Sequence, residues 1–197
     1  MGFLPGIHVV PGGRVDPPDA ISSGFPSDVE SAPHPAVAEA LAGQRPPIAF
    51  LNAALRETYE ETGLLVGRPA HGAVSGNRSS FWQAYQAAGL VPDYGQIDYL
   101  CRAITPVTSR RRFNTRFFLA DGNHAAGTLG GNGELEDLAW WKVSRLADLT
   151  LVDVTQYVLE NALQRWRAQA PIGTSPAKLL NYRKNIMTLS RQRQNRH

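Results

Sequence analysis

Three glutamates lie within five residues of one another in the segment "RETYEETGLL", residues 56–65. On a helix, the side chain of Glu57 would neighbour those of both Glu60 and Glu61, because residues three and four apart share a face. Coulomb's law gives roughly 4 kcal/mol of repulsion per pair at 4 Å and an effective dielectric of 20. A divalent cation turns that repulsion into binding energy. Carboxylate oxygens favour a hard ion, Mg²⁺ or Mn²⁺, and disfavour zinc.

Taken alone, such an acidic run is more often a solvated helix face than a metal site. The helix that must carry it is predicted from Ile48, just after two prolines, to Thr62. Its apolar stripe recurs at threes and fours along the chain: Ile48, Leu51, Leu55, Tyr59 and Thr62. Gly63 provides the left-handed residue that ends a helix, and the three glutamates fall opposite the stripe.

The segment "RETYEETGL" resembles the helix half of the Nudix hydrolase signature: G, five residues, E, seven residues, then R-E-U-x-E-E-x-G-U, where U is bulky and apolar. The matching positions are Arg56, Glu57, Glu60, Glu61, Gly63 and Leu64. Thr58 departs from the first U. Upstream, Gly13 is followed by five residues and then Asp19, one methylene shorter than the usual glutamate. The seven-residue gap is stretched to 36 residues, 20–55.

This enlarged gap is similar to a Nudix subgroup with an insertion at the same point, which includes coenzyme A diphosphatases. "HVVPGGRVDP", "RRFNTRFFLA" and "ELEDLAWW" also resemble that subgroup, so the resemblance covers most of residues 3–165. It implies an α+β fold, a Nudix-type α/β/α sandwich with a mixed sheet and a long proline-rich insertion at about residues 20–47. The family normally has a strand before the "LPG" segment, and we expect this N-terminal strand to be missing.

The resemblance implies a metal-dependent hydrolase. Such an enzyme cleaves the diphosphate bond of a nucleoside diphosphate linked to another moiety, by attack of water on phosphorus. The implied metal ligands are Glu57, Glu60, Glu61, the carbonyl of Gly12 and an acid from a later loop, Glu134. Glu134 could equally be an exposed loop glutamate without a role at the metal site.

The implied catalytic residues are Glu57, Glu61 and Arg56, and the identity of the general base stays open. Arg56 is expected to pair with Asp19 and so to fix the loop that contains Gly13 against the helix.

Arginines near the middle of the chain are candidates for contacts with substrate phosphates: Arg111, Arg112 and Arg116. A guanidinium matches phosphate oxygens in a fork, although arginines that alternate on a strand are equally often its solvated side. Nearby aromatic residues could stack on a base, but core packing is the favoured interpretation for Phe81, Trp82, Tyr85 and Phe113. The implied partner is a small nucleoside diphosphate derivative, with coenzyme A as one of several candidates.

The chain has 197 residues, 43% hydrophobic and 19% charged, as expected for one globular domain, which we place at residues 1–182. Eight of its 20 Lys and Arg residues and none of its 17 acids follow Glu160. Residues 183–197 are therefore predicted to be a basic, flexible tail. A single cysteine, Cys101, suggests a reducing cytoplasm. No segment approaches the ~20 apolar residues that span a bilayer.

The remaining patterns predict strands at residues 7–10, 64–70, 96–106, 114–121 and 135–143, and helices at residues 36–42, 81–90 and 152–169. In the predicted strand at 135–143, Trp140 and Trp141 would be a core and an edge residue.

Two other function classes stay open. A Nudix-fold regulator could bind a nucleotide without significant hydrolysis, although it would not need three glutamates. Nucleic acid binding through the basic tail is disfavoured against a merely solubilising role. The sequence also leaves a homodimer open.

Overall fold

The computed structural model describes residues 6–20, 32–71, 79–105, 112–174, 176–183 and 186–192. Its α-helices within these ranges are α1 (Pro35–Leu41), α2 (Pro47–Thr62), α3 (Ser80–Ala87) and α4 (Asp153–Arg167). Short 3-10 turns are η1 (Pro17–Ala20), η2 (Tyr94–Gln96), η3 (Gly122–His124) and η4 (Val143–Asp148). The predicted helices are thus present, and α1 lies within the proline-rich insertion, of which residues 21–31 fall outside the described residues.

The main sheet has the strand order β5-β4-β7-β8. Its strands are β4 (Asp98–Ile104), β5 (Asn114–Leu119), β7 (Lys178–Arg183) and β8 (Ile186–Arg191). β4 pairs antiparallel with β5 and parallel with β7, so the sheet is mixed. Two small ladders complete the described strands: β1 (Leu65–Val66) with β6 (Ala125–Ala126), and β2 (Arg68–Pro69) with β3 (Leu90–Val91).

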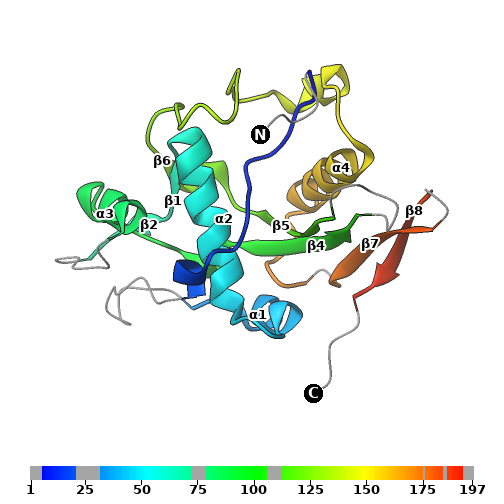
Figure 1. Ribbon diagram of the computed structural model, residues 1–197, viewed down its shortest axis with the longest axis horizontal. Helices are drawn as coiled ribbons and strands as arrows, with labels where there is room; N and C mark the ends of the chain where they lie inside the picture. Colours follow the sequence, from blue (N-terminus) through cyan, green and yellow to red (C-terminus); the bar gives the residue numbers. More distant parts are fainter. Residues whose placement is uncertain are drawn as a thin grey trace.

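Two hydrophobic clusters cover the two faces of this sheet. On one face, Tyr99 of β4 joins the cluster that contains Leu51 and Leu55 of α2. On the other, Leu100 of β4 joins Val158 of α4. Helices α2 and α4 therefore lie on opposite sides of β4 (Figure 1). This arrangement confirms the predicted α+β class with a mixed sheet.

Helix α2 is built as its sequence predicts. Pro47 occupies its first turn, where a missing N–H costs nothing. Gly63 ends it with φ 75° and donates its N–H to the Tyr59 carbonyl at 2.8 Å. A side chain is excluded at this position, because a Cβ on Gly63 would lie 2.6 Å from the Thr128 carbonyl oxygen. Leu51 and Leu55 on its apolar stripe are buried.

Two predicted strands are wrong. Residues 7–10 form no strand; the N-terminal segment instead runs across α2 and is tied at His8, whose N–H donates to the Thr150 carbonyl (Figure 1). Residues 135–143 form no strand either, and Asp137 has φ 54°, which interrupts an extended backbone at that residue. Trp140 and Trp141 are 67% and 40% exposed, so neither is a core residue.

The C-terminal segment also differs from its prediction. Residues 186–191 are not loose but form β8, which pairs along its length with β7 across the expected domain boundary. The segment "IMTLSR" contains β-branched and apolar residues that favour a strand. The basic composition of the whole C-terminal segment hid this local pattern. Residues 193–197 lie outside the described residues. Among the described helices, none is long and apolar enough to span a membrane.

Candidate active site

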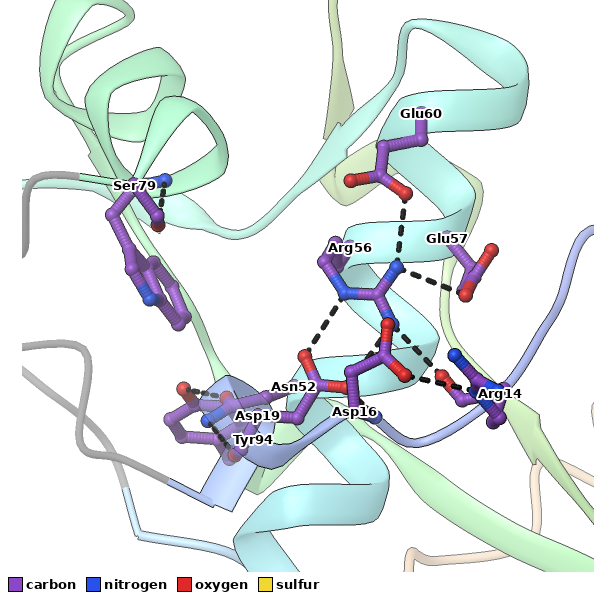
Figure 2. Close-up of polar contacts among 10 residues, drawn as sticks. Arg14, Asp16, Asp19, Asn52, Arg56, Glu57, Glu60, Ser79 and Tyr94 are labelled. Carbon is purple, nitrogen blue, oxygen red and sulfur yellow. Dashed lines mark hydrogen bonds and ion pairs between the residues drawn. The ribbon is translucent and has the colours of Figure 1, made fainter. Parts of the chain in front are cut away.

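Arg56 is the centre of a network that joins α2 to the N-terminal segment (Figure 2). Its Nε and Nη2 atoms donate to the two carboxylate oxygens of Asp19, each at 3.0 Å. Its Nη1 donates to Glu57 Oε1 and Glu60 Oε2, both at 2.9 Å. Nη2 also donates to the Arg14 carbonyl. Burial alone would lower the pKa of Arg56, but the Asp19 carboxylate raises it above its ordinary value. Arg56 therefore remains a cation here.

The loop that contains Gly12 and Gly13, called the glycine loop below, lies directly on the acidic face of α2. A Cβ on Gly13 would overlap the Glu57 carboxylate, so a larger residue here would have to displace that carboxylate. Gly12 donates its N–H to Glu61 Oε2 at 2.8 Å. The structure therefore brings Gly12 and Gly13 to Glu61 and Glu57, which are far apart from them in sequence.

Glu61 differs from its neighbours in how its charge is compensated. Its side chain is 5% exposed. Arg56 neutralises part of the charge on Glu57 and Glu60, but no Lys, Arg or His of the described ranges forms an ion pair with Glu61. Its carboxylate is thus buried with a backbone N–H as its hydrogen-bond donor.

Burial raises the pKa of Glu57, and Arg56 acts in the opposite direction. Burial also raises the pKa of Glu61, the Gly12 N–H opposes this, and the negative charges of Glu57 and Glu134 add to it. Glu134 is therefore close enough to influence Glu61, although its own side chain is exposed. The described acids at this site repel one another, which is the condition that a bound cation would relieve.

The loop that contains Glu134 is positioned by the end of α2. The Gly130 N–H donates to the Thr62 carbonyl and the Asn132 N–H to the Glu60 carbonyl, both at 2.9 Å. These bonds satisfy carbonyls that the last turn of a helix leaves unpaired. A Cβ on Gly131 would overlap the Glu61 carbonyl. The sequence predicted that Glu134 lies in a loop but not that this loop caps the helix.

Sequence reasoning also missed a buried support beneath the network. Asn52 is 1% exposed, donates to the Asp19 carbonyl at 2.9 Å and accepts from the Tyr94 hydroxyl at 2.6 Å. It therefore fixes the backbone of Asp19 from inside the molecule. The signal was present, because Asn52 directly follows Leu51 on the buried side of α2.

The structure describes two of the three candidate arginines. Arg111 lies outside the described residues, and Arg112 is exposed. Arg116 is half-buried on β5, with its guanidinium 3.9 Å from the centre of the Phe50 ring. The aromatic candidates Phe81, Trp82 and Tyr85 belong to the core, as favoured from the sequence, whereas Phe113 is 53% exposed.

The donor set suits a hard divalent cation, although it is not arranged as a ready-made cage. Within the described ranges, no three His, Cys, Asp or Glu side chains are grouped as a metal site. The carboxylates of Glu57, Glu61 and Glu134 nevertheless supply only oxygen donors and mutual repulsion. These are the properties that Mg²⁺ or Mn²⁺ would use.

Comparison with known proteins bears on the family of this chain. No family model matches the sequence, and no curated protein matches it. Among solved structures, the chain is similar to the crystal structure of a Nudix hydrolase from Alicyclobacillus acidocaldarius, with a TM-score of 0.55 and 30% sequence identity. The match covers 81% of this chain and 77% of that one. Together with the Arg56, Glu57, Glu60, Glu61 and Gly63 pattern on α2, this similarity shows that the chain belongs to the Nudix hydrolase family.

Proposed function

We propose that this protein is a metal-dependent hydrolase that cleaves the diphosphate bond of a nucleoside diphosphate linked to another moiety, by attack of water on phosphorus. The observation that carries the proposal is the buried Glu61 carboxylate, which lies beside Glu57 and accepts the Gly12 N–H. A carboxylate buried without a cationic partner is costly unless another cation binds there.

Mg²⁺ or Mn²⁺ would be held by Glu57, Glu60, Glu61 and Glu134, with the Gly12 carbonyl as a further ligand. When bound, such an ion neutralises diphosphate oxygens and acidifies a water molecule. The charges of these acidic side chains make them ligands for this ion, and a carboxylate of the same group can accept the proton of the attacking water. The general base that takes this proton is Glu57 or another of these glutamates.

Arg56 contributes to catalysis by holding other residues in position. Through Asp19 it ties the glycine loop to α2, so that Gly12 and Gly13 stay against Glu61 and Glu57. We include it in the catalytic apparatus for this reason. Arg111, Arg112 and Arg116 are proposed to contact substrate phosphates. Coenzyme A and related nucleotides are the favoured substrates, by analogy with the subgroup that the signature resembles, and a cytoplasmic location is proposed with them.

The test is diphosphate cleavage in Mg²⁺ over a panel that contains coenzyme A, NADH, ADP-ribose and nucleotide sugars. Glu61→Gln keeps an oxygen for the Gly12 N–H but removes the charge. We expect kcat/KM to fall by about 100-fold or more. Glu160→Gln is the matched control, because Glu160 is an exposed glutamate of α4. Equal rates for wild type and Glu61→Gln would remove the assignment.

A second candidate is a Nudix-fold regulator that binds a nucleotide without significant hydrolysis. The observation in its favour is that Arg56 already occupies one oxygen of Glu57 and one of Glu60. Binding of a panel compound with no cleavage in either Mg²⁺ or Mn²⁺ would favour this alternative.

A further inference from the structure

A cavity of about 790 Å³ lies between α1, the first turns of α2, β4, β5 and the end of β8. The side chains around it are unevenly charged. Four arginines contribute to its lining: Arg45, Arg102, Arg116 and Arg191. Its acidic lining residues are Glu39 and Asp98, and Asp98 already forms a buried ion pair with Arg165, which lies outside the lining. The cavity therefore carries an excess of positive charge.

Two of these arginines are neighbours on adjacent strands of the sheet. Arg102 of β4 and Arg116 of β5 are direct partners in the antiparallel register. A register shift between Tyr99 and Cys101 lets Tyr99 and Arg102, three residues apart, line the same cavity. Like charges directly opposite on neighbouring strands destabilise a sheet. An anion between the two guanidinium groups would reverse the sign of that interaction.

Within the described residues, the burial of Arg116 is poorly compensated. Its Nε is buried and has no hydrogen-bond partner among the described residues. Its guanidinium lies over the Phe50 ring, which restrains it but accepts no hydrogen bond in its plane. Burial lowers the pKa of Arg116 below its ordinary value, and the positive charge of Arg102 acts in the same direction. Arg102 is already oriented, because its Nε donates to Asn114 Oδ1 at 2.7 Å.

We propose that this cavity binds a dianion of the phosphate class between Arg102 and Arg116. Guanidinium groups match tetrahedral oxyanions with paired N–H donors, and the flat contact with Phe50 reduces the entropy lost when Arg116 binds. The dianion has two sources, a phosphate monoester on the substrate or free inorganic phosphate.

The cavity and the acidic site both lie along helix α2. Phe50 precedes Glu57 by seven residues on α2, or about two turns and about 10 Å along the helix axis. A substrate whose diphosphate lies at Glu57 could therefore place a second phosphate group near Arg116. This connection rests on the proposed hydrolase function, whereas the binding of a dianion does not.

Calorimetric titration of inorganic phosphate into metal-free protein in EDTA tests the binding. Wild type is expected to bind at one site. Arg102→Gln and Arg116→Gln should each weaken that binding by about tenfold or more. Arg167→Gln removes one charge from an exposed position on α4 and should bind like wild type. Glu61→Gln should also bind like wild type, which separates this site from the acidic one.

Absence of phosphate binding by wild type, or equal affinity in the Arg102, Arg116 and Arg167 variants, would overturn the proposal. If Arg116→Gln does not fold, judged by circular dichroism, the comparison of Arg102→Gln with wild type decides the proposal.

Hydrolysis of matched pairs, coenzyme A with dephospho-coenzyme A and NADPH with NADH, then separates the two sources. A preference for the extra phosphate that disappears in Arg102→Gln identifies a group on the substrate. Equal rates within each pair, with phosphate binding retained, identify free phosphate as the ligand. If no diphosphate is cleaved, the hydrolase function fails, but the phosphate titration still decides this site.

Discussion

Arg56 and Asp19 form a fork-to-fork ion pair across 37 residues of sequence, with Nε–Oδ1 and Nη2–Oδ2 distances of 3.0 Å. Both side chains are mostly buried, at 15% and 5% exposed. The same guanidinium reaches Glu57 and Glu60, so one side chain connects the N-terminal segment, η1 and the acidic face of α2. Such a pair does more to fix geometry than to stabilise the fold in isolation.

Replacing Arg56 by methionine should be strongly destabilising, because it leaves the buried carboxylate of Asp19 without a cation. Breaking a buried pair by removing one partner costs about 3–5 kcal/mol, and we expect a loss in this range in the free energy of unfolding by urea. Arg14→Met is the control, since the Arg14 side chain is 88% exposed in its ion pair with Asp16. That change should stay within about 0.5 kcal/mol. Similar losses in the two variants would contradict the role given to Arg56.

Gly131 and Gly130 should respond differently to alanine. A Cβ at position 131 would overlap the Glu61 carbonyl, whereas at position 130 the nearest atom is 3.8 Å away. We expect Gly131→Ala to lower the free energy of unfolding by about 1–3 kcal/mol and Gly130→Ala to have little effect. Gly131→Ala should also weaken Mg²⁺ binding, because it displaces the loop that contains Glu134. Comparable urea midpoints for both variants would show that the loop does not pack here as described.

Mg²⁺ should stabilise the folded protein through the acidic cluster. At a concentration 100 times its Kd, an ion that binds only the folded state adds about 2.7 kcal/mol. Differential scanning fluorimetry should therefore show a Tm that rises with Mg²⁺ for wild type and for Glu160→Gln, and far less for Glu61→Gln. In EDTA, Glu61→Gln should be at least as stable as wild type, because it removes a buried charge. A full Mg²⁺ response in Glu61→Gln would exclude Glu61 as a ligand.

Cys101 should be unreactive in the folded protein. It is 1% exposed, and burial raises the pKa of its thiol from 9.0 to about 12. The thiolate is the nucleophile that attacks a disulfide reagent, so such a reagent at pH 8 should label Cys101 only after urea unfolding. Rapid labelling of the native protein would contradict this burial.

The same shift predicts a loss of stability in alkali. The folded state keeps the thiol proton that the unfolded chain releases, so this contribution is complete below pH 9.0 and is lost as the pH rises towards about 12. Burial raises the pKa values of Tyr85 and Tyr99 in the same direction. Urea midpoints should fall with pH above 9, and the decrease should be smaller in Cys101→Ala.

The sequence predicted the elements whose signals are local. The apolar stripe, the entrance proline and Gly63 define α2, and these are determined by residues within a few positions of one another. The signature on this helix likewise indicated the family and the Arg56–Asp19 pair. Predictions failed where an extended backbone needed a partner, because the strand patterns at 7–10 and 135–143 do not reveal whether a neighbouring strand is available.

By itself, then, the sequence determined the acidic helix, its capping glycine, the α+β class and the chemical type of the acidic cluster. The tertiary structure alone decided that Gly12 donates to Glu61, that the glycine-rich loop caps the end of α2, and that Arg102 faces Arg116. The reason is physical: a helix forms from hydrogen bonds between residues four apart, whereas these contacts depend on sheet register and on the close approach of backbones distant in sequence.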